Sequence, residues 1–83
     1  RNLQEAASAA AAGRIDEALV RIRQEIAFVP KDPRPRVAEV KTLLEAKRTA
    51  EALKAAEAGL VVFPGNAELM RLREAARGTA GRP

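Results

Sequence analysis

The chain repeats itself at an offset of 34 residues, and this period restricts its fold more than any other feature. Residues 49–66 match residues 15–32, and the shared positions include an acidic residue, an alanine, a leucine and a proline: Glu17-Ala18-Leu19 and Pro30 return as Glu51-Ala52-Leu53 and Pro64. Repeats of this length are typical of stacked helix pairs, in which each pair buries its apolar face only against the next. The period therefore predicts an all-α protein, an α-solenoid of antiparallel helix pairs.

Five helices are expected from the places of the helix-breaking residues, at about residues 2–12, 15–29, 33–46, 50–63 and 67–77. Gly13, Pro30 and Pro64 end the first, second and fourth helices, because glycine and proline do not continue a helix. Thr49 and Asn66 are the expected N-caps of the fourth and fifth. One domain of about residues 1–77 follows, with repeats at 1–32 and 33–66, a capping helix at 67–77 and a disordered tail at 78–83.

The start of the third helix stays open between two positions. Asp32 before Pro33 is a good N-cap followed by a proline at the first helical position. Pro35 disfavours helical geometry at the residue before it, so the helix could instead begin at Pro35.

The core has to be built from small aliphatic side chains, since aromatic residues make up 2% of the chain. Ala18, Leu19, Ile22 and Ile26 lie at helical spacing, as do Leu53, Ala56, Leu60 and Phe63. The fifth helix keeps Leu69 and Leu72, with Met70 beside them, for burial. Phe28 and Phe63 are both expected to be at least half-buried beside the closing prolines, and Glu5 and Glu39 to lie on a solvated face.

These spacings resemble the tetratricopeptide repeat family, whose unit is a 34-residue helix–turn–helix. Ala18 and Ala52 match its small residue early in the second helix, and Pro30 and Pro64 match its closing proline. Lys47 departs from the pattern, because it stands where the first repeat has Gly13. The bulky aromatic residues usual in the first helix of each repeat are also absent.

The resemblance implies a concave groove lined by the first helix of each repeat. Its residues, carried over to this chain, would be Leu3, Ala7, Ala10, Ala11, Arg34, Val37, Lys41, Leu44, Glu45 and Arg71. Alanines would let a peptide or helix approach closely, and Arg34, Lys41 and Arg71 could meet its carboxylates. An acidic peptide is therefore one expected partner, while the alternative for the alanines is packing against a preceding repeat.

Chemistry other than binding has little support in the sequence. The chain has no His and no Cys, so no catalytic residue, metal ligand set or cofactor site is expected. Net charge is +4 and basic pairs recur, but single-strand recognition usually adds stacking aromatics, which makes nucleic acid an unlikely partner. The longest strongly apolar run, Leu60–Phe63, is far shorter than a membrane span.

The sequence thus predicts a protein–protein interaction module and not an enzyme. Its ligand would be a peptide or a partner helix held in the concave groove. The alternative is a structural segment that self-associates through exposed ends of the solenoid, with the alanine-rich first helix as the contact. The Ala/Arg-rich composition is typical of GC-rich bacterial genomes. Compartment does not follow from these residues.

Overall fold

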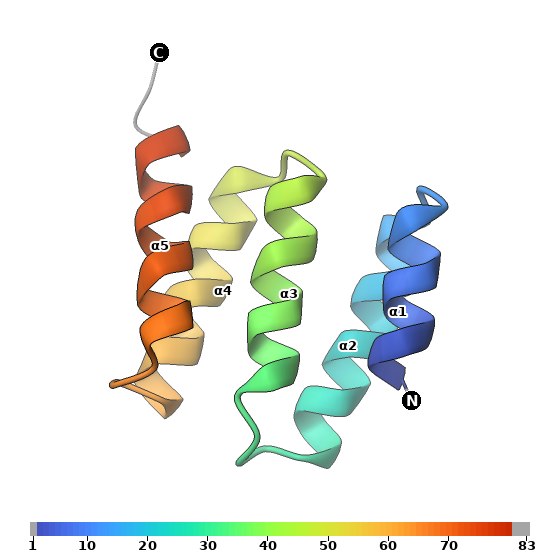
Figure 1. Ribbon diagram of the computed structural model, residues 1–83, viewed down its shortest axis with the longest axis horizontal. Coiled ribbons are helices and arrows are strands. Elements are labelled where there is room, and N and C mark those ends of the chain that lie inside the picture. Colours follow the sequence, from blue (N-terminus) through green and yellow to red (C-terminus); the bar gives the residue numbers. More distant parts are fainter. Residues whose placement is uncertain (1, 81–83) are drawn as a thin grey trace.

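The chain folds into five α-helices joined by short turns, in a computed structural model that describes residues 2–80 and the side chains of residues 2–78. The helices are α1 (Asn2–Ala11), α2 (Ile15–Phe28), α3 (Arg34–Glu45), α4 (Thr49–Val62) and α5 (Ala67–Ala80). Consecutive helices run antiparallel (Figure 1). The described residues contain no strand, so the prediction of an all-α fold with five helices is confirmed.

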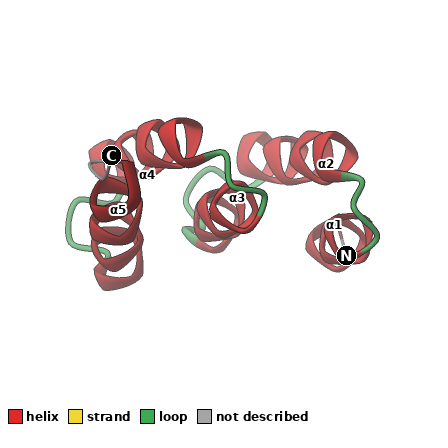
Figure 2. Ribbon diagram, turned by 90° about the horizontal axis from the view of Figure 1, so that it is seen from above, coloured by secondary structure: helices red, strands yellow, loops and turns green. Residues whose placement is uncertain are grey.

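The helices form two layers. Seen from above in Figure 2, α1, α3 and α5 lie in one row and α2 and α4 lie in the other. Each helix contacts its neighbours in sequence, α3 also contacts both α1 and α5, and α2 and α4 do not approach each other closely. This is the arrangement of a helical-repeat array, with α1–α2 as the first hairpin, α3–α4 as the second, and α5 after them.

The 34-residue period is visible in the backbone angles. Arg14, before α2, has φ −90° and ψ 71°, and Arg48, before α4, has φ −93° and ψ 66°. The residues that follow the same helices, Val29 and Phe63, share φ −126°, with ψ 68° and 70°. The two hairpins therefore begin and end their second helices in the same conformation.

The core repeats with the same period. In the first hairpin, Ala6 and Ala9 of α1 pack with Ala18 and Ile22 of α2, and all four are at most 2% exposed. The residues 34 positions later, Val40, Leu43, Ala52 and Ala56, belong to the core cluster of the second hairpin and are fully buried. The second cluster also contains Leu19 of α2 and Leu69 and Ala76 of α5, so it joins the two hairpins and the last helix.

Gly59 lets α5 approach α4 closely. It is buried in the last turn of α4, and a Cβ atom built on it would lie 3.0 Å from Cδ1 of Leu69. Contacts this short do not fit ordinary van der Waals packing. The Leu69 side chain therefore packs directly against the backbone of Gly59, where a larger residue would clash with it.

Several helix boundaries differ from the sequence prediction. Thr49 is the first residue of α4 and not its N-cap; Arg48 precedes the helix without a side-chain cap. Helix α3 begins at Arg34, between the two expected starts, and the Arg34 N–H donates to Asp32 Oδ1 at 3.0 Å. Asn66 caps α5 as predicted, because its Oδ1 accepts the Leu69 N–H at 2.8 Å.

Helix α5 continues beyond its predicted end. Residues 78–80, assigned from the sequence to a disordered tail, are helical. Gly78 has low helix propensity, but no proline interrupts this stretch. The remaining tail, residues 81–83, lies outside the described residues.

Three burial predictions were wrong. Phe28 is 81% exposed, because the last turn of α2 extends past the helices that pack on it. Met70 is 39% exposed, since it faces away from the core side of α5 that carries Leu69 and Ala76. Glu39 is buried, with 8% of its surface exposed, because α3 turns this side chain toward α2, where Arg23 meets it.

Candidate functional site

A hollow of about 280 Å³ lies between α1 and α3. It is lined mostly by small apolar side chains of α1, with polar side chains on the α3 side: Leu3, Ala6, Ala7, Ala10, Ala11, Ile22, Ala38, Lys41, Thr42 and Glu45. The floor is therefore apolar and Lys41 and Glu45 flank it on α3. Pockets that enclose small-molecule ligands usually measure roughly 300–1,000 Å³. The size of this one suits side chains from a partner surface instead.

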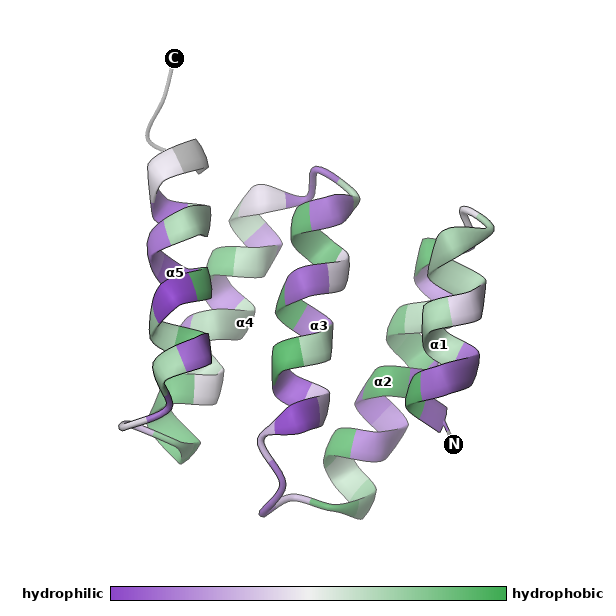
Figure 3. Ribbon diagram, in the orientation of Figure 1, coloured by the Kyte–Doolittle hydropathy of each residue, from purple (hydrophilic) through white to green (hydrophobic). Residues whose placement is uncertain are grey.

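The hollow exists because α1 is built from alanines. Ala7 and Ala10 of α1 stand 34 positions before Lys41 and Leu44 of α3, which are much larger. Leu44 packs against the core cluster that includes α4 and α5. The alanines cannot fill the corresponding space beside α3, and α1 appears as a mostly pale green helix in Figure 3. Small side chains thus leave apolar surface open between these helices.

Six of the ten groove residues predicted from the sequence line this hollow: Leu3, Ala7, Ala10, Ala11, Lys41 and Glu45. Val37 and Leu44 are instead half-buried and pack against the core cluster. The sequence prediction missed Ala6, Ile22, Ala38 and Thr42. Ala6 and Ile22 could have been found from their helical spacing, since both belong to the core cluster of the first hairpin, whose members line the hollow.

The three basic residues predicted for the groove are each close to a carboxylate of the same chain. Arg34 donates to Asp32, with Nη2–Oδ2 at 2.6 Å. Lys41 Nζ lies 3.7 Å from Oε2 of Glu68, and Arg71 pairs with the same carboxylate. The hydrogen bonds from Arg34 lower the pKa of Asp32. An acidic peptide would therefore have to compete with carboxylates already in place.

Glu45 differs from these basic residues. It is exposed at the edge of the hollow, and no ion pair involves it among residues 2–80. The unpaired charge at this edge is thus negative, a feature that the sequence prediction did not single out.

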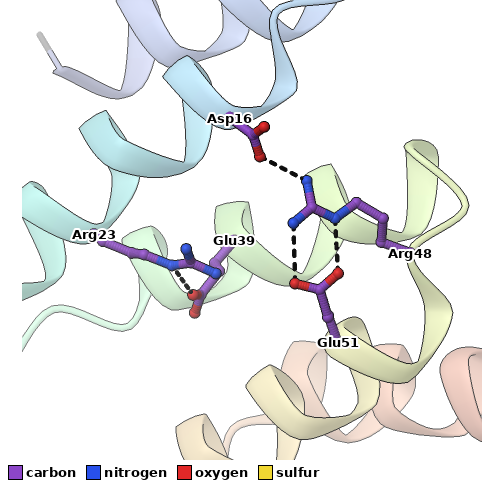
Figure 4. Close-up of polar contacts among 5 residues, drawn as sticks. All are labelled: Asp16, Arg23, Glu39, Arg48 and Glu51. Carbon is purple, nitrogen blue, oxygen red and sulfur yellow. Dashed lines mark hydrogen bonds and ion pairs between the residues drawn. The ribbon is translucent and has the colours of Figure 1, made fainter.

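A second polar cluster joins the hairpins on the side of α2 and α4 (Figure 4). Nε of Arg23 in α2 donates to Oε2 of Glu39 in α3 at 2.9 Å. Arg48 donates to Glu51 through Nε and Nη2 and reaches Oδ1 of Asp16 through Nη1 at 2.8 Å. Figure 4 shows the Arg48 guanidinium held between these two carboxylates. The hydrogen bonds from Arg48 lower the pKa of Glu51 and raise that of Arg48 itself.

Other hollows have a different character, and one of them, of about 440 Å³, lies around the charged cluster of Arg23, Glu39 and Glu51. Another, of about 360 Å³, lies on the first hairpin and has a polar lining of Gln4, Glu5, Ser8, Arg14, Glu17 and Arg21. A third, of about 570 Å³, is formed by the single turn of residues 29–33. The turn alone offers no second element that could fix a ligand, so the hollow between α1 and α3 is the better candidate for a binding groove.

Neither a metal site nor a membrane-spanning helix is found in the part of the chain that the structure describes. No group of three or more acidic side chains could hold a metal ion there, and none of the helices is both long and apolar enough to cross a bilayer. No protein-family model, curated protein or solved structure matches this chain.

Proposed function

We propose that the protein is a protein–protein interaction module that holds a peptide or a partner helix in the hollow between α1 and α3. The observation that carries this proposal is the alanine floor beside an edge that bears Lys41 and Glu45. Small residues allow a partner backbone to come close, and apolar side chains of the partner gain free energy when they leave water. The two charges on α3 would fix the direction in which the partner lies.

The tetratricopeptide repeat family remains part of this proposal. Its support is the 34-residue period, the nearly equal backbone angles at Arg14 and Arg48, and the two-layer order of the helices. In that family the layer of α1, α3 and α5 would be the one that receives the ligand, which agrees with the position of the hollow.

The alternative of self-association through the solenoid ends has less support. It relied on an apolar contact surface on α1, but the polar hollow on the first hairpin is surrounded by ion pairs, among them Arg21 with Glu5 at 2.6 Å and Arg14 with Glu17 at 3.0 Å. Desolvating such pairs is costly unless a partner replaces their contacts.

The proposal can be tested with a displayed library of random peptides selected on the wild-type protein. Selected peptides should bind wild type and lose affinity for Ala7→Phe, because the phenyl ring would occupy the hollow. The matched control is Ala27→Phe, since Ala27 is exposed on α2 and does not line the hollow. Backbone amide shifts should change on addition of peptide at Leu3, Ala10 and Thr42.

The proposed groove would be wrong if Ala7→Phe and Ala27→Phe bound the peptides equally well. Amide shifts confined to α2 and α4 would also contradict it, since they would place the ligand on the other layer. A selection that yields no binding peptide would remove the support for peptide recognition.

A further inference from the structure

The structure contains one example of how a hairpin docks on the hairpin before it, and this example defines the contact chemistry. Glu39 of α3 is buried against α2 and accepts a hydrogen bond from Arg23. Thr42 of α3 is also buried. At the start of α4, Arg48 binds Glu51 of its own helix and reaches back to Asp16 of α2. The charged groups on both sides of the contact are thus paired.

The first hairpin carries the same residues at the same places on its outer face. Glu39, Thr42, Arg48 and Glu51 are preceded, 34 positions earlier, by Glu5, Ser8, Arg14 and Glu17. Three of these four positions are identical and the fourth keeps its hydroxyl. All four belong to the lining of the polar hollow of about 360 Å³. The surface that docks the second hairpin onto the first is therefore present again on the first hairpin.

Arg14 resembles Arg48 in conformation and in its first contact, but Arg48 also makes a second contact, with the preceding hairpin. The two residues have nearly the same backbone angles, and each pairs through Nε with the glutamate three residues later, at 3.0 Å and 2.8 Å. Arg48 uses Nη1 for Asp16 of the preceding hairpin. Arg14 contacts Glu17 through Nε, and its side chain is 58% exposed, against 33% for that of Arg48.

The charges at the positions equivalent to Glu5 also follow a pattern. In the contact between α2 and α3, Arg23 meets Glu39. At the corresponding places of α4 and α5 the charges are exchanged, with Glu57 and Arg73. Opposite charges thus occur at this pair of positions in both cases, although Arg73 lies beside Glu74 of its own helix, at 3.6 Å. A hairpin placed before α1 would accordingly offer a basic residue toward Glu5, which now has Arg21 beside it at 2.6 Å.

The last helix lacks the corresponding docking residues at the other end. Helices α1 and α3 pack on their own second helix through Ala6 and Ala9, and through Val40 and Leu43. The same places in α5 are Glu74 and Arg77, which are exposed and paired with each other at 3.1 Å. A further second helix could not bury these charges without losing their hydration, so α5 acts as a cap.

We infer that the outer face of the first hairpin is a docking surface for one more helical hairpin of the same repeat type. That hairpin would carry a carboxylate at the place of Asp16, which pairs with Arg14, and a basic residue at the place of Arg23, which pairs with Glu5. This surface is separate from the proposed peptide groove, and it gives the array a direction: it accepts a hairpin before α1 and not after α5.

The inference can be tested by fusing a copy of residues 1–34 directly before Arg1 of the full chain, which keeps the repeat in register. The extended protein should unfold in a single transition at a higher melting temperature than the original chain. Hydrogen exchange of the α1 amides should slow, because the docked hairpin covers this helix.

Two variants of the extended protein identify the contact. The substitutions Asp16→Asn and Arg23→Gln in the copied hairpin remove its two contact charges. They should abolish most of the increase in melting temperature. Arg14→Ala in the original repeat should lower the melting temperature of the extended protein more than that of the unextended chain. The same substitution at Arg77 serves as the control, because it should have equal effects in both.

Separate unfolding of the added hairpin, or unchanged exchange in α1, would overturn the inference. The inference would also fail if Arg14→Ala lowered the melting temperature of the extended and the unextended chain equally. If the extended protein aggregated, a hydrogen-exchange measurement on the dilute soluble fraction would still decide whether α1 is covered.

Discussion

Lys47 adopts the left-handed backbone conformation of its repeat counterpart Gly13, with φ 65° against 85°. The two turns also share their hydrogen bonds, since the N–H of Gly13 donates to Ala10 and that of Lys47 to Leu44. A residue with a Cβ atom pays about 1–2 kcal/mol in this conformation, while glycine does not. The departure of Lys47 from the repeat pattern is therefore a departure in residue type and not in structure.

We expect Lys47→Gly to stabilise the protein by about 1 kcal/mol, because it removes this strain at an exposed position. The free energy of unfolding in urea measures the effect. Gly13→Lys is the reverse change in the corresponding turn between α1 and α2 and should destabilise by a similar amount. A loss of stability in Lys47→Gly would show that the strain is small compared with the added freedom of the unfolded chain.

Ala52→Leu should destabilise the protein by about 1–3 kcal/mol, because extra methylenes overpack a well-filled core. Ala52 is fully buried with Val40 and Leu43 in the second hairpin. Ala58→Leu on the same helix should have little effect, since Ala58 is exposed. The melting temperatures of both variants test the repeat register. Equal decreases in melting temperature would contradict it.

Removing one partner of the ion pair between Arg23 and Glu39 should lower the stability of the protein more than removing both. The side chain of Glu39 is 11% exposed and that of Arg23 is 52% exposed. Arg23→Met should cost about 1–3 kcal/mol, because it leaves a buried carboxylate without its donor. The double variant with Glu39→Met should recover part of this loss, as both charges are then gone. Arg14→Met is the control and should cost less than about 1 kcal/mol, since its pair is exposed.

Acid should weaken the contact of Arg48 with Glu51. The pKa of Glu51 is lowered by hydrogen bonds from Arg48, so the folded state binds a proton less readily than the unfolded chain. This stabilisation is complete above the ordinary glutamate value of 4.5 and disappears as the pH falls toward the folded pKa. Wild type should therefore exceed Glu51→Gln in urea midpoint at neutral pH, and the difference should shrink in the acid range. A constant difference across pH would contradict this linkage.

An acidic peptide bound in the hollow between α1 and α3 would meet Lys41. Lys41→Glu should then slow association, more at low than at high salt, because charges at the edge of an interface act mainly on encounter. Glu45→Lys, one turn away on α3, should speed it. Association rates at two salt concentrations measure both effects, and fold stability should change little. Equal rates for the three proteins at low salt would place the peptide elsewhere.

The sequence by itself determined the repeat and the helices. The 34-residue period gave the order of five helices, because a breaker or cap recurs at each boundary, as Pro30 and Pro64 do. It also placed the buried alanines Ala18 and Ala52, since spacing along a helix fixes which residues share a face.

Tertiary structure alone decided what surrounds each side chain. Glu39 is buried and Phe28 is exposed, although polarity predicted the opposite for both, because burial depends on where a neighbouring helix ends. The hollow beside Ala7 likewise depends on the distance between α1 and α3. Arg48 reaches Asp16 across 32 residues of chain, a contact that no local pattern contains. Local sequence specifies helices through short-range backbone bonds, whereas a groove or an ion pair requires the positions of two helices at once.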